Sequence, residues 1–86
     1  MTKARKGKPI YHRGSLYVSE SYDAVKDKVY YTVVNCENNM HRHYNYMLQA
    51  IMTCKWAGRG VIPPGYSTAA RRDMYYLLHG TEEGFE

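Results

Sequence analysis

The segment from residue 28 to residue 34, KVYYTVV, constrains the fold of this chain more than any other. It is dense in β-branched and aromatic side chains, which fit the pleated surface of a β-strand. Because alternate side chains of a strand point to opposite faces, this segment presents apolar groups on both of its faces. Two apolar faces are typical of a strand with neighbours on both sides. We therefore expect this segment to be the central strand of a small sheet.

Two segments that precede the central strand supply its partners. The first, residues 15–22, has Leu16, Val18 and Tyr22 on one face, an alternation that only Glu20 interrupts. Its other face carries Tyr17, Ser19 and Ser21. The second segment, residues 10–13, is shorter and connects to the first through a turn at residues 13–14. The sequence thus predicts a small antiparallel sheet of about three strands, over residues 10–13, 15–22 and 28–34.

Two helices are predicted after the sheet. Asn38 and Asn39 are residue types that cap helix starts, and the apolar residues after them recur at intervals of three and four. This pattern predicts a helix over residues 39–57 whose apolar stripe lies on the sheet, formed by Met40, Tyr44, Met47, Leu48, Ile51 and Cys54. A cap at Ser67 or Thr68 and a stop at Gly80 predict a second helix over residues 67–79, with Ala70, Met74, Leu77 and Leu78 on its buried side.

These elements predict one domain of the α+β class. A chain of 86 residues, with 44% hydrophobic and 23% charged residues, has the length and composition of a single folded domain. We place the domain at residues 9–80. Residues 1–8 are basic and have no large apolar side chain after Met1, so we expect a disordered arm there, and residues 81–86 form an acidic tail.

The two cysteines and the hydropathy of the chain bear on its location. Two cysteines are too few for the disulfide framework of a small secreted protein. No apolar run approaches the roughly 18 residues that span a bilayer, and the basic start lacks the apolar stretch of a signal peptide. We therefore expect a cytoplasmic protein with no membrane association, whose oligomeric state the sequence leaves open.

Four potential metal ligands, Cys36, His41, His43 and Cys54, flank or lie on the first predicted helix. Structural zinc sites hold ligands in pairs two to four residues apart, which this spacing does not reproduce. On a helix, His41 and His43 would project about 200° apart. Cys54 would lie on the apolar stripe, where a thiol acts as a small hydrophobe. We assign no metal or other cofactor and leave open whether this group ever binds an ion.

No arrangement typical of catalysis is present in the sequence. It has no nucleophile elbow and no glycine-rich phosphate loop, and its carboxylates are scattered singly. We therefore expect a protein that is not an enzyme and acts by binding.

The second predicted helix carries a basic, aromatic face. Arg72, Tyr76 and His79 recur at intervals of four and three residues, with Arg71 and Tyr75 beside them. Guanidinium groups bind phosphate oxygens and tyrosine rings stack on bases, so this mixture suits nucleic acid. The alternative is a solvated helix face on which the same side chains cover the edge of the core.

Positive charge in the arm extends this hypothesis. The chain has 12 Lys and Arg against 8 Asp and Glu, a net charge of +4. The arm carries Lys3, Arg5, Lys6 and Lys8, which together with the helix face could form one positive track. The preferred hypothesis is a small accessory or regulatory protein that binds nucleic acid, or a nucleic-acid-handling complex, through this basic, tyrosine-rich surface.

A protein partner is the alternative. Trp56, Met47 and Met52 belong to residue types that concentrate binding energy at protein interfaces. In size and composition the chain is similar to small accessory proteins of bacteriophages, many of which inhibit or redirect host enzymes. That resemblance implies an inhibitor that binds and blocks a host or viral protein.

Overall fold

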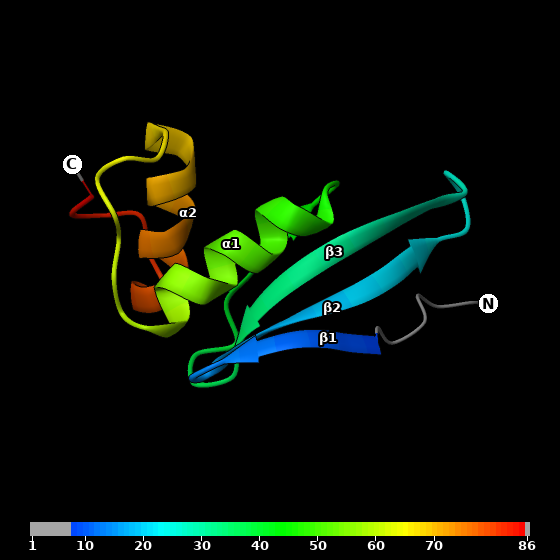
Figure 1. Ribbon diagram of the computed structural model, residues 1–86, viewed down its shortest axis with the longest axis horizontal. Coiled ribbons are helices and arrows are strands. Elements are labelled where there is room, and N and C mark those ends of the chain that lie inside the picture. The colour runs from blue at the N-terminus through cyan, green and yellow to red at the C-terminus, as the bar shows by residue number, and fades with distance from the viewer. Residues whose placement is uncertain (1–7, 86) are drawn as a thin grey trace.

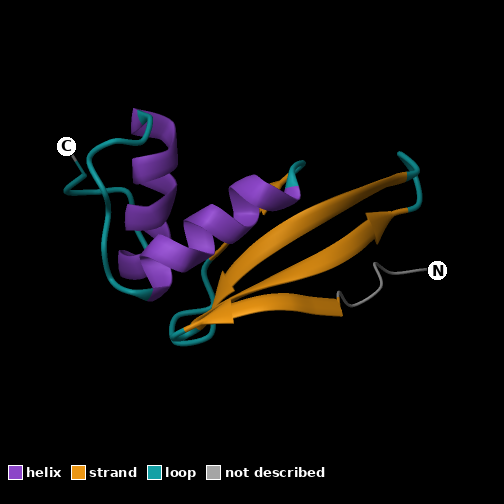
Figure 2. Cartoon of the chain, in the orientation of Figure 1, coloured by secondary structure: helices purple, strands orange, loops and turns teal. Residues whose placement is uncertain are grey.

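The computed structural model describes residues 8–85 of the chain. Four strands precede two helices, and their order is β1 (Lys8–Arg13), β2 (Leu16–Asp23), β3 (Lys28–Asn35), β4 (His41–Tyr44), α1 (Met47–Gly58) and α2 (Thr68–His79). Figures 1 and 2 show the strands together in one sheet with the helices beside it. The predicted α+β fold, an antiparallel sheet with two helices, is confirmed.

The sheet is a meander in which each strand pairs with the next along the chain. Its order is β1-β2-β3-β4, and all neighbouring strands are antiparallel. β3 is an inner strand, as its two apolar faces predict. The pairing of β1 with β2 shifts register between Pro9 and Tyr11, which places one unpaired residue in the edge strand.

The prediction of a helix over residues 39–57 is wrong in its first part, because residues 41–44 form β4 and the helix begins only at Met47. The asparagines make a turn instead of a helix cap. Asn39 adopts a left-handed backbone conformation with φ of 63°, and the Asn38 side chain accepts a hydrogen bond from the Met40 amide at 2.9 Å. Asparagine favours both features, which reverse the chain from β3 into β4.

The buried side of α1 also differs from the predicted stripe. Its buried residues are Ala50, Thr53, Cys54 and Ala57. Leu48 is 76% exposed and Met47 43% exposed, so the stripe is correct at Cys54 and wrong at these two positions. Small residues on the buried side let the helix lie close to the sheet.

Two glycines lie where the end of α1 meets the β1–β2 turn. A Cβ atom at Gly14, in the β1–β2 turn, would lie 2.5 Å from the Gly58 carbonyl oxygen. A Cβ atom at Gly58 would lie 2.4 Å from the Arg13 carbonyl oxygen. Both distances are far below van der Waals contact, so only glycine permits this backbone-to-backbone packing.

Helix α2 follows its prediction closely. The Ser67 hydroxyl accepts a hydrogen bond from the Ala70 amide at 3.2 Å, and Gly80 ends the helix with φ of 78°. Met74 and Leu77 are fully buried, while Ala70 and Leu78 are half-buried. No helix within residues 8–85 has the length and apolar character needed to cross a membrane.

Both helices pack on the same face of the sheet. Val18 and Val33, which pair with each other across β2 and β3, belong to one buried cluster with residues of α1 and α2. Asn35, two residues after Val33 and on the same face, donates to the Leu77 carbonyl of α2 at 2.8 Å. In Figure 1, α1 and α2 lie to one side of the strands. The opposite face of the sheet therefore has no helix over it.

We expect Gly58→Ala to lower the free energy of unfolding by about 1 to 3 kcal/mol, because the new methyl group meets a backbone oxygen that cannot move aside. Denaturant unfolding followed by circular dichroism measures this change. Gly65→Ala is the matched control, because a Cβ atom there meets nothing within 4 Å. Equal stability of the two variants would contradict the packing described here.

We also expect Asn35→Ala to cost about 1 to 3 kcal/mol, because the substitution leaves buried polar groups without partners. Asn35 is 3% exposed, and besides its bond to Leu77 its side-chain oxygen accepts from the Glu37 amide at 2.9 Å. Thermal unfolding compares it with Asn45→Ala, an exposed position. A loss no larger than that of the control would show that Asn35 does not anchor α2.

Candidate functional site

The acidic tail packs onto the helix face that the sequence predicts as a binding surface. The Phe85 ring lies 5.7 Å from the Tyr75 ring and 5.8 Å from the guanidinium groups of both Arg71 and Arg72. The Tyr75 hydroxyl donates to the Glu83 carbonyl at 3.0 Å. Part of the predicted α2 surface is thus occupied by the chain's own tail.

Other members of the predicted α2 surface differ in their exposure. Arg72 and His79 are exposed, and the His79 ring lies 4.3 Å from the half-buried Tyr75 ring. Arg71 is half-buried, and its Nε atom is buried without a hydrogen-bond partner among the described residues. Arg72 and His79 are therefore the members most accessible to a partner.

Tyr76 takes part in a polar cluster that the sequence analysis did not anticipate. The Arg42 guanidinium lies 3.8 Å from the centre of the Tyr76 ring and forms ion pairs with Asp73 at 3.2 Å and Glu82 at 2.5 Å. The Tyr44 hydroxyl donates to the other Asp73 oxygen at 2.8 Å. Burial is the main cause that raises the pKa of Tyr44, so the phenol stays a neutral donor. This cluster joins β4, α2 and the tail, and it is structural.

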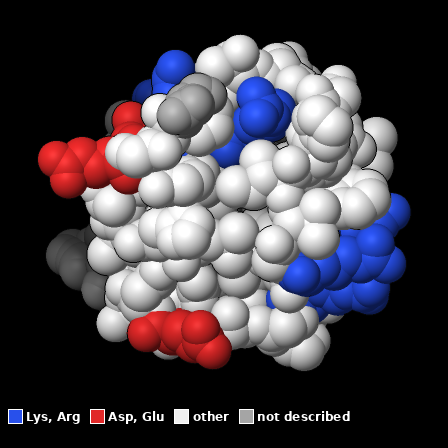
Figure 3. All heavy atoms as spheres, turned by 90° about the vertical axis from the view of Figure 1, so that its left-hand side faces the viewer, with Lys and Arg blue, Asp and Glu red and all other residues white. Residues whose placement is uncertain are grey.

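The start of β1 and helix α2 do not lie together. The molecule measures 40 × 24 × 22 Å, and Figure 1 shows the start of β1 and helix α2 toward opposite ends of its long axis. Lys8 is exposed at the start of β1, whereas Lys3, Arg5 and Lys6 lie outside the described residues. Figure 3 views the α2 end and shows acidic and basic side chains on the same face. Among the described residues, Lys8 and the α2 arginines thus form no single positive track.

The four potential metal ligands are also separated. Cys54 lies on the buried side of α1, and burial raises the pKa of its thiol to about 11, so it stays protonated. Cys36 is exposed in the turn after β3. Residues 8–85 contain no group of three or more His, Cys, Asp or Glu side chains placed to hold a metal ion. The predicted divergence of His41 and His43 is wrong, however, because alternate residues of a strand share a face.

The helix-free face of the sheet carries the most distinctive chemistry of the described chain. Across the strands, Tyr17 pairs with His12 and Val34, and Val34 pairs with His41. In the neighbouring rows Thr32 pairs with Ser19 and His43, and Ser21 pairs with Tyr30. We name this surface the open face, and it consists of His12, Tyr17, Ser19, Ser21, Tyr30, Thr32, Val34, His41 and His43.

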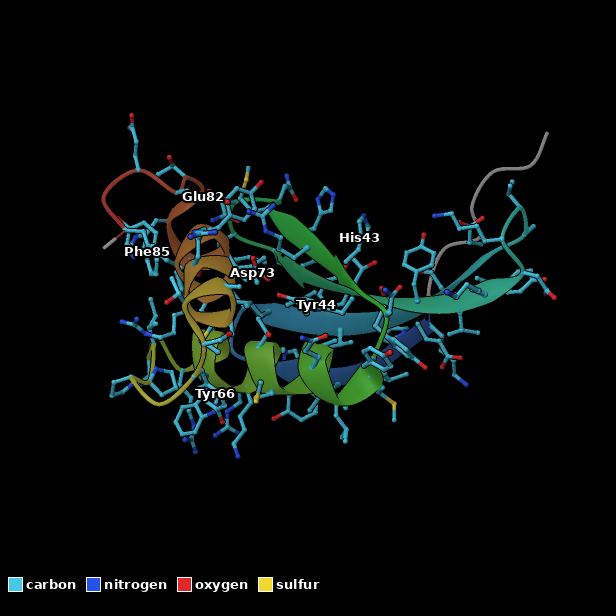
Figure 4. The ribbon with its side chains drawn as sticks, turned by 90° about the horizontal axis from the view of Figure 1, so that it is seen from above. His43, Tyr44, Tyr66, Asp73, Glu82 and Phe85 are labelled. Carbon is cyan, nitrogen blue, oxygen red and sulfur yellow. The ribbon has the colours of Figure 1, made fainter. Side chains whose placement is uncertain are left out.

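Rings on β3 and β4 form a continuous cluster within the open face. The His43 ring lies 5.1 Å from the His41 ring and 5.4 Å from the Tyr30 ring, which meets it edge to face. The Thr32 hydroxyl and His43 Nδ1 share a hydrogen bond of 2.9 Å. In Figure 4, His43 lies on the side of the sheet away from α1. Both histidines are exposed and Tyr30 is half-buried, so a flat ligand could contact these rings directly.

A hollow of about 410 Å³ continues the open face toward the β2–β3 turn, and it is lined by Asp23, Lys26, Lys28, Tyr30, His43 and Asn45. Tyr30 and His43 belong to both the hollow and the open face. The Asp23 carboxylate accepts hydrogen bonds from the amides of Val25 and Lys26 at 3.0 and 3.3 Å. The hollow therefore places two ammonium groups and an imidazole beside the ring cluster, with one carboxylate engaged by the turn.

Sequence reasoning missed the open face because it assigned residues 41–44 to a helix. It placed Tyr17, Ser19 and Ser21 correctly on the face opposite Leu16 and Val18. The available signal was the alternation of residues 41–44, HRHY, which matches a strand as well as a helix.

Comparison with known proteins returned no match to a family model, to a curated protein or to a solved structure. The functional argument therefore depends on the geometry of the chain itself.

We expect the pKa of His43 to lie below its ordinary value of about 6.5, because partial burial and the nearby charge of His41 disfavour its cationic form. A folded-state pKa below the unfolded one means that, at pH values between the two, the unfolded state binds more protons than the folded state. The contribution of His43 to stability is then lost as pH falls through 6.5 toward its folded pKa. Titration of its ring resonances by NMR measures the shift, and His41→Gln should raise the pKa. A value that does not change in this variant would contradict the coupling.

Proposed function

We propose that this chain is a small non-enzymatic protein that binds single-stranded nucleic acid through the open face of its sheet. The observation that carries the proposal is a set of exposed and half-buried rings on a sheet face that neither helix covers. Every base has an apolar ring face, so rings presented on a flat surface bind unpaired bases with little regard to sequence. Duplex bases are already stacked on one another, which favours single strands as the ligand.

Rings of the open face lie on three neighbouring strands. Tyr17 lies on β2, Tyr30 on β3, and His41 and His43 on β4, so a strand that crosses the sheet meets rings on three neighbouring elements. Stacking on an aromatic ring contributes about 1 to 3 kcal/mol per base. The hydroxyls of Tyr17, Ser21 and Tyr30 add donors for sugar and phosphate oxygens, whereas Ser19 is only 8% exposed.

Positive charge lies at one end of this surface. The hollow contains Lys26 and Lys28, and β1 begins toward the same end of the sheet (Figure 1). The basic residues Lys3, Arg5 and Lys6 immediately precede this strand in the sequence. Phosphates of a strand that stacks on the rings would thus meet cations beside the hollow, in agreement with the net charge of +4.

The α2 surface predicted from sequence is a weaker candidate for the main contact. Its arginines and Tyr75 contact the tail, and the tail brings carboxylates to the same end. Arg72 and His79 remain exposed and could add contacts. Variants on the two surfaces separate these alternatives.

We expect the chain to bind a fluorescein-labelled oligothymidine, and to do so less tightly as salt rises from about 50 to 200 mM, because phosphate contacts release counterions. Tyr17→Ala and Tyr30→Ala should each weaken binding by about 5- to 100-fold through loss of stacking. Fluorescence anisotropy measures the dissociation constants.

Tyr46→Ala is the matched control for these variants, because Tyr46 is 73% exposed but lies outside the open face. Its affinity should equal that of the parent chain, and Arg72→Ala should reduce affinity by less than either open-face variant. Absence of binding at the lower salt concentration would refute the proposed function. Loss confined to Arg72→Ala would transfer it to α2.

An exposed apolar group at the start of α1 supports a second candidate, a protein that blocks a host or viral partner. Tyr46, Met47 and Leu48 are 73%, 43% and 76% exposed. Trp56 and Met52, predicted as anchors, are half-buried, and Trp56 Nε1 donates to the Tyr66 hydroxyl at 3.1 Å. The anchor of such an interface would therefore lie at the helix start, and its affinity would depend little on salt.

A cytoplasmic location belongs to the same proposal. Both Cys36 and Cys54 are free thiols, which suits a reducing compartment.

A further inference from the structure

His41 and His43 stand side by side on β4 and point away from the helices. They are separated by one residue of a strand, so they share a face, and the centres of their rings are 5.1 Å apart. Both side chains are exposed. Neighbouring imidazoles on a rigid element are a common beginning of a transition-metal site.

The ring separation fits chelation of one ion. A metal–nitrogen bond to histidine is about 2.0 to 2.1 Å long, so two rings held by one tetrahedral ion have centres about 5 Å apart. The observed 5.1 Å matches this value. The strand backbone thus sets the separation before any ion arrives, which reduces the ordering that binding requires.

Thr32 orients one of the two ligands. Its hydroxyl is hydrogen-bonded to His43 Nδ1 at 2.9 Å, which leaves Nε2 as the ring nitrogen available to an ion. A partner on the non-ligating nitrogen fixes the tautomer and orientation of a metal-bound histidine.

We propose that His41 and His43 chelate one divalent transition-metal ion of the borderline class, such as Ni²⁺ or Zn²⁺, with water in its remaining coordination positions. The site differs from the four-ligand group considered from sequence, because neither cysteine belongs to it. It does not depend on whether the open face binds nucleic acid.

Calorimetric titration with NiCl₂ and with ZnCl₂ tests the proposal. The parent protein is the full chain without a histidine tag and with Cys36→Ser, which removes the exposed thiol as a competing ligand. We expect one ion per chain. His41→Ala and His43→Ala should each weaken binding at least tenfold, and Thr32→Val should weaken it to a smaller extent.

His12→Ala is the matched control, because His12 lies on the same face but on β1, which β2 and β3 separate from β4. It should bind as the parent does. Broadening of the His41 and His43 ring resonances by substoichiometric Ni²⁺ provides a readout in the unmutated site. The proposal would be overturned if the parent did not bind, if His41→Ala and His43→Ala bound as tightly as the parent, or if His12→Ala lost as much affinity as they do.

Discussion

The packing of both helices against one face of the sheet is the constraint on which the rest of the structure depends. Val18 and Val33 meet the small residues of α1 and the apolar side of α2, and the contact between Gly14 and Gly58 brings helix and sheet backbones together. Because a chain of 86 residues has only these two helices in its described part, the other face of the sheet remains accessible to solvent. That face carries tyrosine, histidine, serine and threonine, residue types that accept water on one side and a ligand on the other.

Local patterns predicted most of this fold. The alternation in β2 and β3 reflects side chains that point to alternate faces of a strand, and the cap and stop residues of α2 bond to backbone groups within four residues, so both are legible in sequence. The error at residues 39–57 has a physical cause. Met40 and Tyr44 are four residues apart, a spacing that shares a face in a helix and equally in a strand. Only the left-handed turn at Asn39 decides between them, and asparagine serves as a cap or as a turn residue.

The candidate site depends on tertiary contacts, which explains why less of it was predicted. The aromatic and basic spacing on α2 is real, but Phe85 lies against its arginines and Tyr75. No local pattern indicates that the tail returns to the helix. Arg42 likewise finds Asp73 and Glu82 far along the chain. The open face combines residues from four strands, so it becomes visible only when the register of those strands is known.

The central claim is that the helix-free face of the sheet, and not α2, receives the bases of a single strand. Intermolecular nuclear Overhauser effects between the isotope-labelled chain and unlabelled oligothymidine test it most directly. We predict cross-peaks from thymine protons to the rings of Tyr17, Tyr30 and His43. Cross-peaks confined to Tyr75, His79 or Tyr46 would contradict the account.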